Sequence, residues 1–221
     1  MNARPPGFEP DRIVVMKVAL SGPNYRVLPP QLSFMERLLD RARTAPGVQA
    51  VGITSAAQVG LVVVEGAPRW PAGQEPQTVY RTASAGYFRV LGVRLVKGRW
   101  LGDDEPAESV MVNEAFVRRV FGNEDPLGKR VRIPRQPPSY AAIVGVAGDL
   151  KSSKLDADPE PEIYIPYRQS PSLRLMNVVM KTSADPLPTG GTVRKLLAAI
   201  DPSQPIYGIQ TMEDTLAESV A

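Results

Sequence analysis

Proline is the feature of this sequence that most limits what the chain can fold into. It supplies 23 of the 221 residues, twice the usual share of ~5%. Proline disrupts the hydrogen bonds of a helix interior or a central strand, so the regular elements must be short and joined by many irregular connections. The longest apolar runs, Val59–Val64 and Ala141–Ala147, are far below the ~20 residues that span a bilayer. We therefore expect no transmembrane segment, and the start of the chain lacks the apolar stretch of a signal peptide.

The side chains that most enzymes depend on are absent. The sequence contains no cysteine and no histidine, which removes thiol nucleophiles, the usual zinc ligands and the Ser-His pair. Lys and Arg number 26 against 23 Asp and Glu, and the cations are scattered rather than gathered into the stripe typical of nucleic-acid binding. We therefore expect a folded protein with no nucleic-acid partner. The lack of cysteine is compatible with either redox compartment and favours export.

A strand–helix–strand pattern opens the chain. The β-branched run Arg12–Leu20 predicts a buried strand, and apolar spacing over Leu32–Ala42 predicts a helix. Ser33 and Glu36 have the spacing of a capping box at the beginning of that helix. A second strand over Val48–Ser55 completes the unit, which indicates a layer of helices on a sheet.

The same order recurs near the end of the chain. Strands are predicted over Leu175–Lys181 and Pro205–Ile209. Between them, Asp185-Pro186 can cap and start a helix, but Gly190-Gly191 weakens its first turns by ~1 kcal/mol each. We therefore expect the helix to start at Thr192.

The middle of the chain predicts short strands and two short helices. Helices over Ala85–Leu91 and after the N-cap Asn113 are followed by Gly92 and Gly122, each suited to the left-handed position that ends a helix. Strands are expected at Thr78–Ser84, Val93–Lys97, Val110–Val112, Lys129–Ile133, Tyr140–Val146 and Glu162–Tyr167. The fold class is therefore α+β. We expect a discontinuous αβ subdomain of residues 7–98 and 172–221, with a smaller sheet-rich subdomain of residues 99–171 inserted into it.

Two clusters resemble ligand sites but have simpler interpretations. Gly122 and Gly128-Lys129 resemble a phosphate loop, yet five residues separate the glycines where the motif has four, and Arg130 replaces its Ser or Thr. We interpret them as a helix C-cap followed by a turn. A second cluster could offer oxygen ligands to a hard cation, but its spacing is not that of an EF-hand, and we expect a solvated acidic loop. Its members are Asp103, Asp104, Glu105 and Glu108.

Two further clusters lie close together after an apolar strand. Gly145–Asp149 resembles a glycine loop that approaches a ligand; the simpler interpretation is a sharp strand exit in which Asp149 accepts hydrogen bonds from nearby amides. Ser152 or Ser153 with Lys154 is the one hydrolytic pair open to a chain without histidine. Such a lysine must be desolvated, so a polar loop is the simpler interpretation here as well.

The apolar candidates for contact lie mainly in one loop. Ala57–Gln77 is rich in proline and glycine and predicts a long loop with at most one edge strand. Its patch Leu61–Val64 is either tucked against the sheet or left as an interaction surface. Trp70 and Trp100 are possible partner anchors or partly buried side chains, whereas Tyr87 and the adjacent Phe88 predict core packing.

The order of several short motifs resembles a known family. They are Ser84–Phe88, Leu91-Gly92, Gly98-Arg99, Val112–Glu114, Arg118-Arg119, Asp125–Arg130, Val144–Val146, Gly148-Asp149 and Glu162–Tyr167. Together they resemble the periplasmic core domain of MacB- and FtsX-like ABC transporter permeases, nearest to the permease group abundant in Acidobacteria. The resemblance runs from Gly7 to Ala221, and the segment Gln58–Pro76 departs from it.

The resemblance implies a non-catalytic domain with no catalytic, cofactor-binding or metal-ligating residues and no cofactor. In the family, this domain lies between the first and second transmembrane helices of a permease, at the periplasmic face of the inner membrane. The helix from Thr211 would lead into the second of those spans. The implied partners are the flanking transmembrane helices, an ATP-binding subunit, a second permease copy and a periplasmic partner protein. We expect Gln58–Pro76 to contact that partner. Two alternatives stay open: a free-standing module that binds a small apolar ligand, and a Ser-Lys hydrolase.

Overall fold

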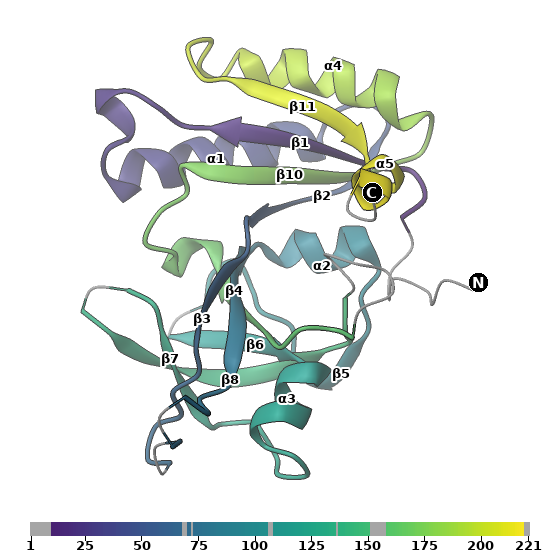
Figure 1. Ribbon diagram of the computed structural model, residues 1–221. Coiled ribbons are helices and arrows are strands. Elements are labelled where there is room, and N and C mark those ends of the chain that lie inside the picture. The colour runs from purple at the N-terminus through teal and green to yellow at the C-terminus, as the bar shows by residue number, and fades with distance from the viewer. Residues whose placement is uncertain are drawn as a thin grey trace.

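The computed structural model describes residues 10–67, 70–71, 73–105, 108–135, 137–150 and 158–218. Over these residues the predicted α+β class is confirmed, with one eleven-stranded sheet and five α-helices (Figure 1). The strands are β1 (Ile13–Ala19), β2 (Val48–Ser55), β3 (Gln58–Leu61), β4 (Gln77–Ala83), β5 (Leu95–Gly98), β6 (Ser109–Asn113), β7 (Arg130–Ile133), β8 (Ser139–Ala147), β9 (Glu162–Pro166), β10 (Leu175–Thr182) and β11 (Ile206–Thr211). The helices are α1 (Leu28–Arg43), α2 (Ala85–Leu91), α3 (Glu114–Val120), α4 (Pro186–Ala198) and α5 (Met212–Glu218), with 3-10 turns η1 (Pro23–Tyr25) and η2 (Tyr167–Gln169).

The sheet runs through the whole molecule in the order β11-β1-β10-β2-β4-β9-β6-β8-β5, with β3 on β4 and β7 on β8. We call β11, β1, β10 and β2 with helices α1 and α4 the α1/α4 half. We call β4, β3, β9, β6, β8, β7 and β5 with helix α3 the α3 half. Strand β2 meets β4 at a single register pair, Thr54 with Ala83, so the sheet is narrow where the halves join. The predicted boundaries between residues 7–98, 99–171 and 172–221 stay a prediction.

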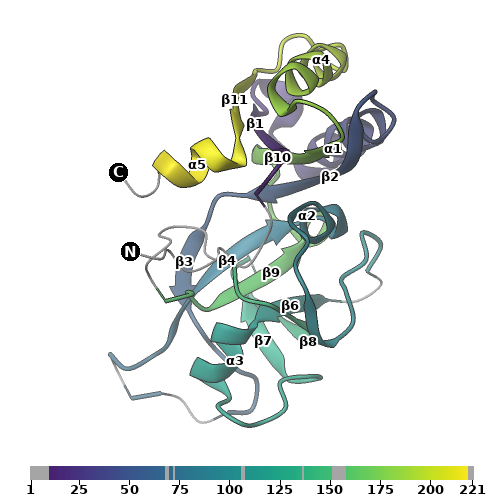
Figure 2. The same cartoon turned by 90° about the vertical axis from the view of Figure 1, so that its right-hand side faces the viewer.

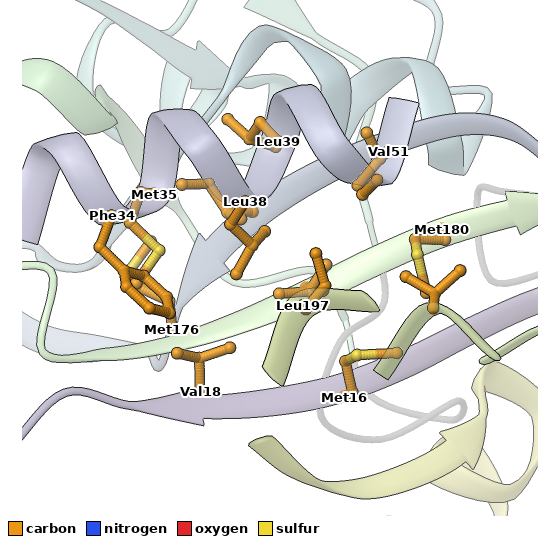
Figure 3. Close-up of a cluster of buried hydrophobic side chains, with 14 of the residues drawn as sticks. Met16, Val18, Phe34, Met35, Leu38, Leu39, Val51, Met176, Met180 and Leu197 are labelled. Carbon is orange, nitrogen blue, oxygen red and sulfur yellow. The ribbon is translucent and has the colours of Figure 1, made fainter. Parts of the chain in front are cut away.

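The α1/α4 half is built on strand alternation. In β1, Val14, Met16 and Val18 point toward α1 and α4, whereas Ile13 and Val15 point to the opposite face. Figure 3 shows Met16 and Val18 grouped with side chains of α1, α4 and β10. Each fully buried side chain of this size stabilises the fold by about 1.5–3 kcal/mol, so this face holds the two helices on the sheet.

Helix α1 begins earlier than the sequence predicts. It starts at Leu28, after Val27, and its prolines fall in the first turn, where the missing N–H groups would have no helical partner. Ser33 therefore lies inside the helix, and Glu36 pairs with Arg168 at 2.8 Å. The capping box predicted for Ser33 and Glu36 is wrong because proline supplies the start signal.

Helix α4 also begins earlier than predicted, at Pro186. Asp185 caps it by accepting a hydrogen bond from the N–H of Leu187 at 3.3 Å. The start expected at Thr192 is wrong because Gly190 has a packing role. A Cβ added there would lie 2.9 Å from Cγ2 of Val14, so glycine lets the helix approach β1 closely.

The α3 half follows its local signals. Asn113 caps α3 as predicted, with Oδ1 accepting hydrogen bonds from the N–H groups of Phe116 and Glu162, both at 2.9 Å. Gly92 and Gly122 have φ of 64° and 60° just after α2 and α3, which confirms both predicted helix ends. The strands β6 and β9 are buried throughout, as expected for the centre of a covered sheet.

Helix α2 lies between the two halves, below β2 and above β9 in Figure 2. Gly86 and Gly52 allow this position, because a side chain on either would overlap backbone atoms of β2 or α2. Tyr87 and Phe88 are buried, so the predicted core role is confirmed. The Phe88 ring meets that of Tyr164 edge-on at 5.0 Å, which connects α2 to β9.

Candidate functional site

The chain enters and leaves the described fold at the same place. Val14 near the start of β1 pairs with Thr211 at the end of β11, and α5 begins at the next residue. Arg12 is held beside the end of β10, where its carbonyl accepts a hydrogen bond from the N–H of Thr182 at 2.9 Å. Figure 1 shows α5 and the beginning of β1 on the same side of the molecule. The beginning of β1 and the end of β11 therefore lie side by side in the α1/α4 half.

A buried ion pair lies beside the narrow join between the halves, and its arginine also makes a hydrogen bond across that join. Arg81 of β4 donates to Oε1 of Glu162 on β9 at 3.1 Å and to the carbonyl oxygen of Ser55 at the end of β2 at 3.3 Å. Only 11% of the Arg81 side chain and 2% of the Glu162 side chain are exposed. Burial alone would lower the pKa of Arg81, but the Glu162 carboxylate together with Tyr87 and Tyr164 outweighs burial, so the net pKa is raised. The guanidinium thus remains charged and ties β2, β4 and β9 together.

Two tyrosines surround this ion pair. Burial raises the pKa of Tyr87 to about 12, and Glu162 adds to that shift. Burial, followed by the Glu162 charge, raises the pKa of Tyr164 well above its ordinary value. Both phenols therefore stay neutral and do not compete with the carboxylate for the arginine. Sequence reasoning missed this cluster because its charged members, Arg81 and Glu162, are far apart in the chain.

The loop Gln58–Pro76 combines buried and exposed apolar residues. It holds one edge strand, β3, as predicted, and β3 pairs with β4. Val62 is buried and Val64 forms a bridge with Val131 of β7, so part of the apolar patch is tucked against the sheet. Val59 is 71% exposed and Trp70 is 40% exposed.

Trp70 also lines an open groove of about 410 Å³ beside the end of α3. Its apolar wall includes Val64 from the loop Gln58–Pro76, Val120 at the end of α3 and Phe121 directly after that helix. Trp100, the other tryptophan, packs on Phe88 with ring centroids 5.2 Å apart. Trp70, which borders an open apolar groove, is therefore the better candidate of the two tryptophans for contact with a partner protein.

The acidic loop is only partly the solvated loop that the sequence predicts, because 87% of the Asp104 side chain is exposed whereas those of Asp103 and Glu105 are largely covered. Glu105 is nearly buried and binds Arg99 through both carboxylate oxygens at 2.7 and 2.9 Å, which lowers its pKa. Oδ1 of Asp103 accepts a hydrogen bond from the N–H of Ala85 at the start of α2, at 2.9 Å. Asp104 pairs with Arg168 at 3.3 Å.

Glu108, the fourth acid of that loop, pairs with Arg135. The four carboxylates are thus spread over separate arginine and amide partners. Within the described ranges, no three acidic side chains gather closely enough to hold a metal ion.

The remaining polar candidates have structural roles where they are described. Asp149 accepts a hydrogen bond from the N–H of Ala115 at 2.7 Å and pairs with Arg118 at 2.8 Å, so it holds the start of α3 rather than amides near it in sequence. Gly145 packs against the carbonyl oxygen of Arg99. Gly128 has φ of 78°, which fits the predicted turn. The Ser152, Ser153 and Lys154 candidates lie outside the described residues.

A comparison with protein families decides the relationship. The model of the MacB-like periplasmic core domain matches residues 4–196. The chain belongs to this family. Macrolide export ATP-binding/permease protein MacB of Aggregatibacter actinomycetemcomitans is 32% identical to the MacB-like chain over 84 residues, which are 37% of this chain and 12% of that protein. The chain thus spans only a small part of this curated relative.

Solved structures share the MacB-like fold at low sequence identity. The periplasmic region of MacB from Actinobacillus actinomycetemcomitans has a TM-score of 0.64 at 18% identity and covers 96% of this chain and 94% of its own. The extracellular domain of the ABC-type transporter YknZ from Gram-positive bacteria has a TM-score of 0.59 at 17% identity, with 88% and 100% covered. A permease domain from Porphyromonas gingivalis has a TM-score of 0.59 at 16% identity, with 92% of both chains covered.

These comparisons identify the chain as a MacB-like periplasmic domain of an ABC transporter permease. The periplasmic face of the inner membrane is the location that the family implies. Among the described residues, each helix is too short or too polar to cross a bilayer.

Proposed function

We propose that this domain is the moving extracytoplasmic part of a transporter permease and performs no catalysis. Transmembrane helices would flank it at both ends, and a separate ATP-binding subunit would hydrolyse ATP in the cytoplasm. The movement would act on an extracytoplasmic substrate or partner. The observation that carries the proposal is the pairing of Val14 with Thr211, which places the beginning of β1 beside the end of β11. A domain inserted between two neighbouring helices needs this arrangement.

The fold offers a path for the movement. Displacement of the flanking helices would reach β1, β11 and α5, all in or beside the α1/α4 half. The α3 half would follow through the narrow β2–β4 join, where Arg81 bridges Ser55 and Glu162. A second permease copy would contribute a second domain that moves in the same way. The surface around Trp70, on the α3 half, would contact a periplasmic partner protein.

Distance measurement in the complete permease tests this proposal. Spin labels at Arg37→Cys on α1 and Arg119→Cys on α3 report on the two halves, and both positions are exposed in a chain without cysteine. We expect the distance distribution measured by pulsed electron paramagnetic resonance to change when ATP is added to the permease with its ATP-binding subunit.

Two controls accompany the measurement. Labels at Arg37→Cys and Arg194→Cys both lie on the α1/α4 half, on α1 and α4, and their distribution should not change. A hydrolysis-deficient ATP-binding subunit should prevent cycling between the two distributions. Identical Arg37–Arg119 distributions with and without ATP would refute the coupling role.

A further inference from the structure

A second groove, of about 540 Å³, opens at the far end of β1 from α5. Its walls come from the ends of β1 and β2, from β4 and from the segment that leads into β10, so both halves contribute. In Figure 1 this region lies on the left, where β1 ends and β10 begins. The volume is within the ~300–1,000 Å³ typical of sites for small molecules.

The groove has positive charge and no acid in its lining. Its charged residues are Arg81 and Arg174, and none of the described residues that line it is Asp or Glu. The charge of Arg81 is balanced by Glu162 behind the wall. Arg174 forms no ion pair within the described part of the chain; its Nε donates to the carbonyl oxygen of Leu20 at 3.3 Å. One guanidinium therefore has the capacity to bind an anion at the rim.

The rest of the lining is largely apolar. Leu20, Tyr80 and Ile165 form buried parts of the wall, and Pro171 adds an edge. Leu175 lies directly after Arg174 and is 67% exposed, an unusual position for a leucine at the beginning of a central strand. An exposed leucine and an unpaired arginine thus share one rim, with an apolar wall behind them. A ligand that matches both has an anionic head and a hydrocarbon chain.

We propose that this groove binds a single-chain anionic amphiphile. Its carboxylate or phosphate accepts hydrogen bonds from the Arg174 guanidinium, and its acyl chain covers Leu175 and lies along the wall toward Leu20. The bidentate geometry of a guanidinium suits both head groups. This site does not depend on the coupling role proposed above, because its walls are complete in the domain alone.

Displacement of a fluorescent fatty acid from the 221-residue chain tests the proposal. Dansylaminoundecanoate serves as the probe and dodecanoate as the competitor, with the uncharged dodecanol as a comparison. We expect saturable probe binding that dodecanoate reverses and dodecanol reverses at least ~10-fold less well, because loss of a charge-assisted contact weakens binding by about that factor. Absence of saturable binding, or equal competition by dodecanol, overturns the proposal.

Variants locate the site. Arg174→Gln should weaken binding at least ~10-fold, Arg174→Lys should restore part of it, and Leu175→Ser should weaken it several-fold. Arg37→Gln, an exposed arginine of α1 outside the groove, is the matched control and should bind as the unaltered chain does. Thermal unfolding of each variant verifies that it folds. Equal binding by Arg174→Gln and the unaltered chain would overturn the assignment.

The same head and chain could come from a free amphiphile or from a membrane lipid. Cosedimentation with phosphatidylglycerol vesicles, compared with phosphatidylcholine vesicles, separates the two sources. Arg174-dependent binding of dodecanoate without vesicle binding supports a free single-chain amphiphile. Arg174-dependent vesicle binding without saturable binding of the fatty acids would indicate a two-chain lipid instead and would overturn the single-chain proposal. If neither ligand binds in a way that depends on Arg174, the proposal fails.

Discussion

Replacing Glu162 by Ala tests the buried ion pair at the join between the halves. The change leaves the Arg81 guanidinium 11% exposed beside an empty space, with Ser55 O as its remaining partner at 3.3 Å. Breaking a buried pair by removing one member costs about 3–5 kcal/mol, because the other charge stays desolvated without compensation. We therefore expect Glu162→Ala to lower the free energy of unfolding by about that amount. For a chain of this length, the loss corresponds to a fall in Tm of roughly 10 °C.

A double-mutant cycle in urea separates the ion pair from simple packing. Arg81→Met with Glu162→Leu removes both charges and also the Arg81 Nε, which has no hydrogen-bond partner among the described residues. Glu162→Leu alone and Arg81→Met alone complete the cycle. The double variant should recover most of the stability that Glu162→Leu alone loses, because no uncompensated charge remains. Arg119→Met is the control, since Arg119 is exposed on α3 and its loss should change stability by under ~0.5 kcal/mol. Additive losses, or a Glu162→Ala cost below about 1 kcal/mol, would refute the reasoning.

Three further changes follow from individual contacts. Asn113→Ala removes three hydrogen bonds, two that the side chain accepts from the N–H groups of Phe116 and Glu162 and one that it donates to the carbonyl oxygen of Glu160. It should cost about 2 kcal/mol in urea unfolding, whereas Asn123→Ala on the exposed turn after α3 should be neutral; equal effects would contradict the capping role. Gly190→Ala should destabilise through its contact with β1, but Gly191→Ala, which meets nothing within 4 Å, should stabilise by up to ~1 kcal/mol; calorimetry that gives both the same sign would contradict the packing. The pKa of Glu105 is lower in the folded protein than its unfolded-state value near 4.5, so its ionised form stabilises the fold above that value. This stability is lost as the pH falls through the lower, folded-state pKa. Glu105→Gln should therefore make the free energy of unfolding depend less steeply on pH in that range, and an unchanged slope would contradict the reasoning.

Local signals predicted most of the elements correctly. The ends of α2 and α3 could be predicted because Gly92 and Gly122 act through their own φ angles. The Asn113 cap could be predicted because its side chain reaches an amide three residues away. The predicted starts of α1 and α4 were wrong. Proline rather than Ser33 started α1, and the packing of Gly190 on β1 outweighed the cost of glycine in α4.

Contacts between distant residues could not be predicted. The sequence predicts that Asp103 lies in a solvated loop and that Asp149 accepts hydrogen bonds from amides near it in the chain. Each instead holds the start of a helix from another part of the chain. Their roles depend on which loop the fold places beside which helix. The groove rim formed by Arg174 and Leu175 could not be predicted either, because the groove exists only once β1 and β10 lie side by side.

By itself, the sequence determined the α+β class, the short elements and the absence of the usual catalytic side chains, since composition and hydrogen bonds within a few residues decide these properties. The tertiary structure alone decided that Arg81 pairs with Glu162, that the chain enters and leaves at one point, and that a cationic, partly apolar groove lies between the halves. The physical reason is register. The parallel pairing of β4 with β9 and the antiparallel pairing of β1 with β10 and β11 are set by the packing of the whole core, and no local pattern encodes them.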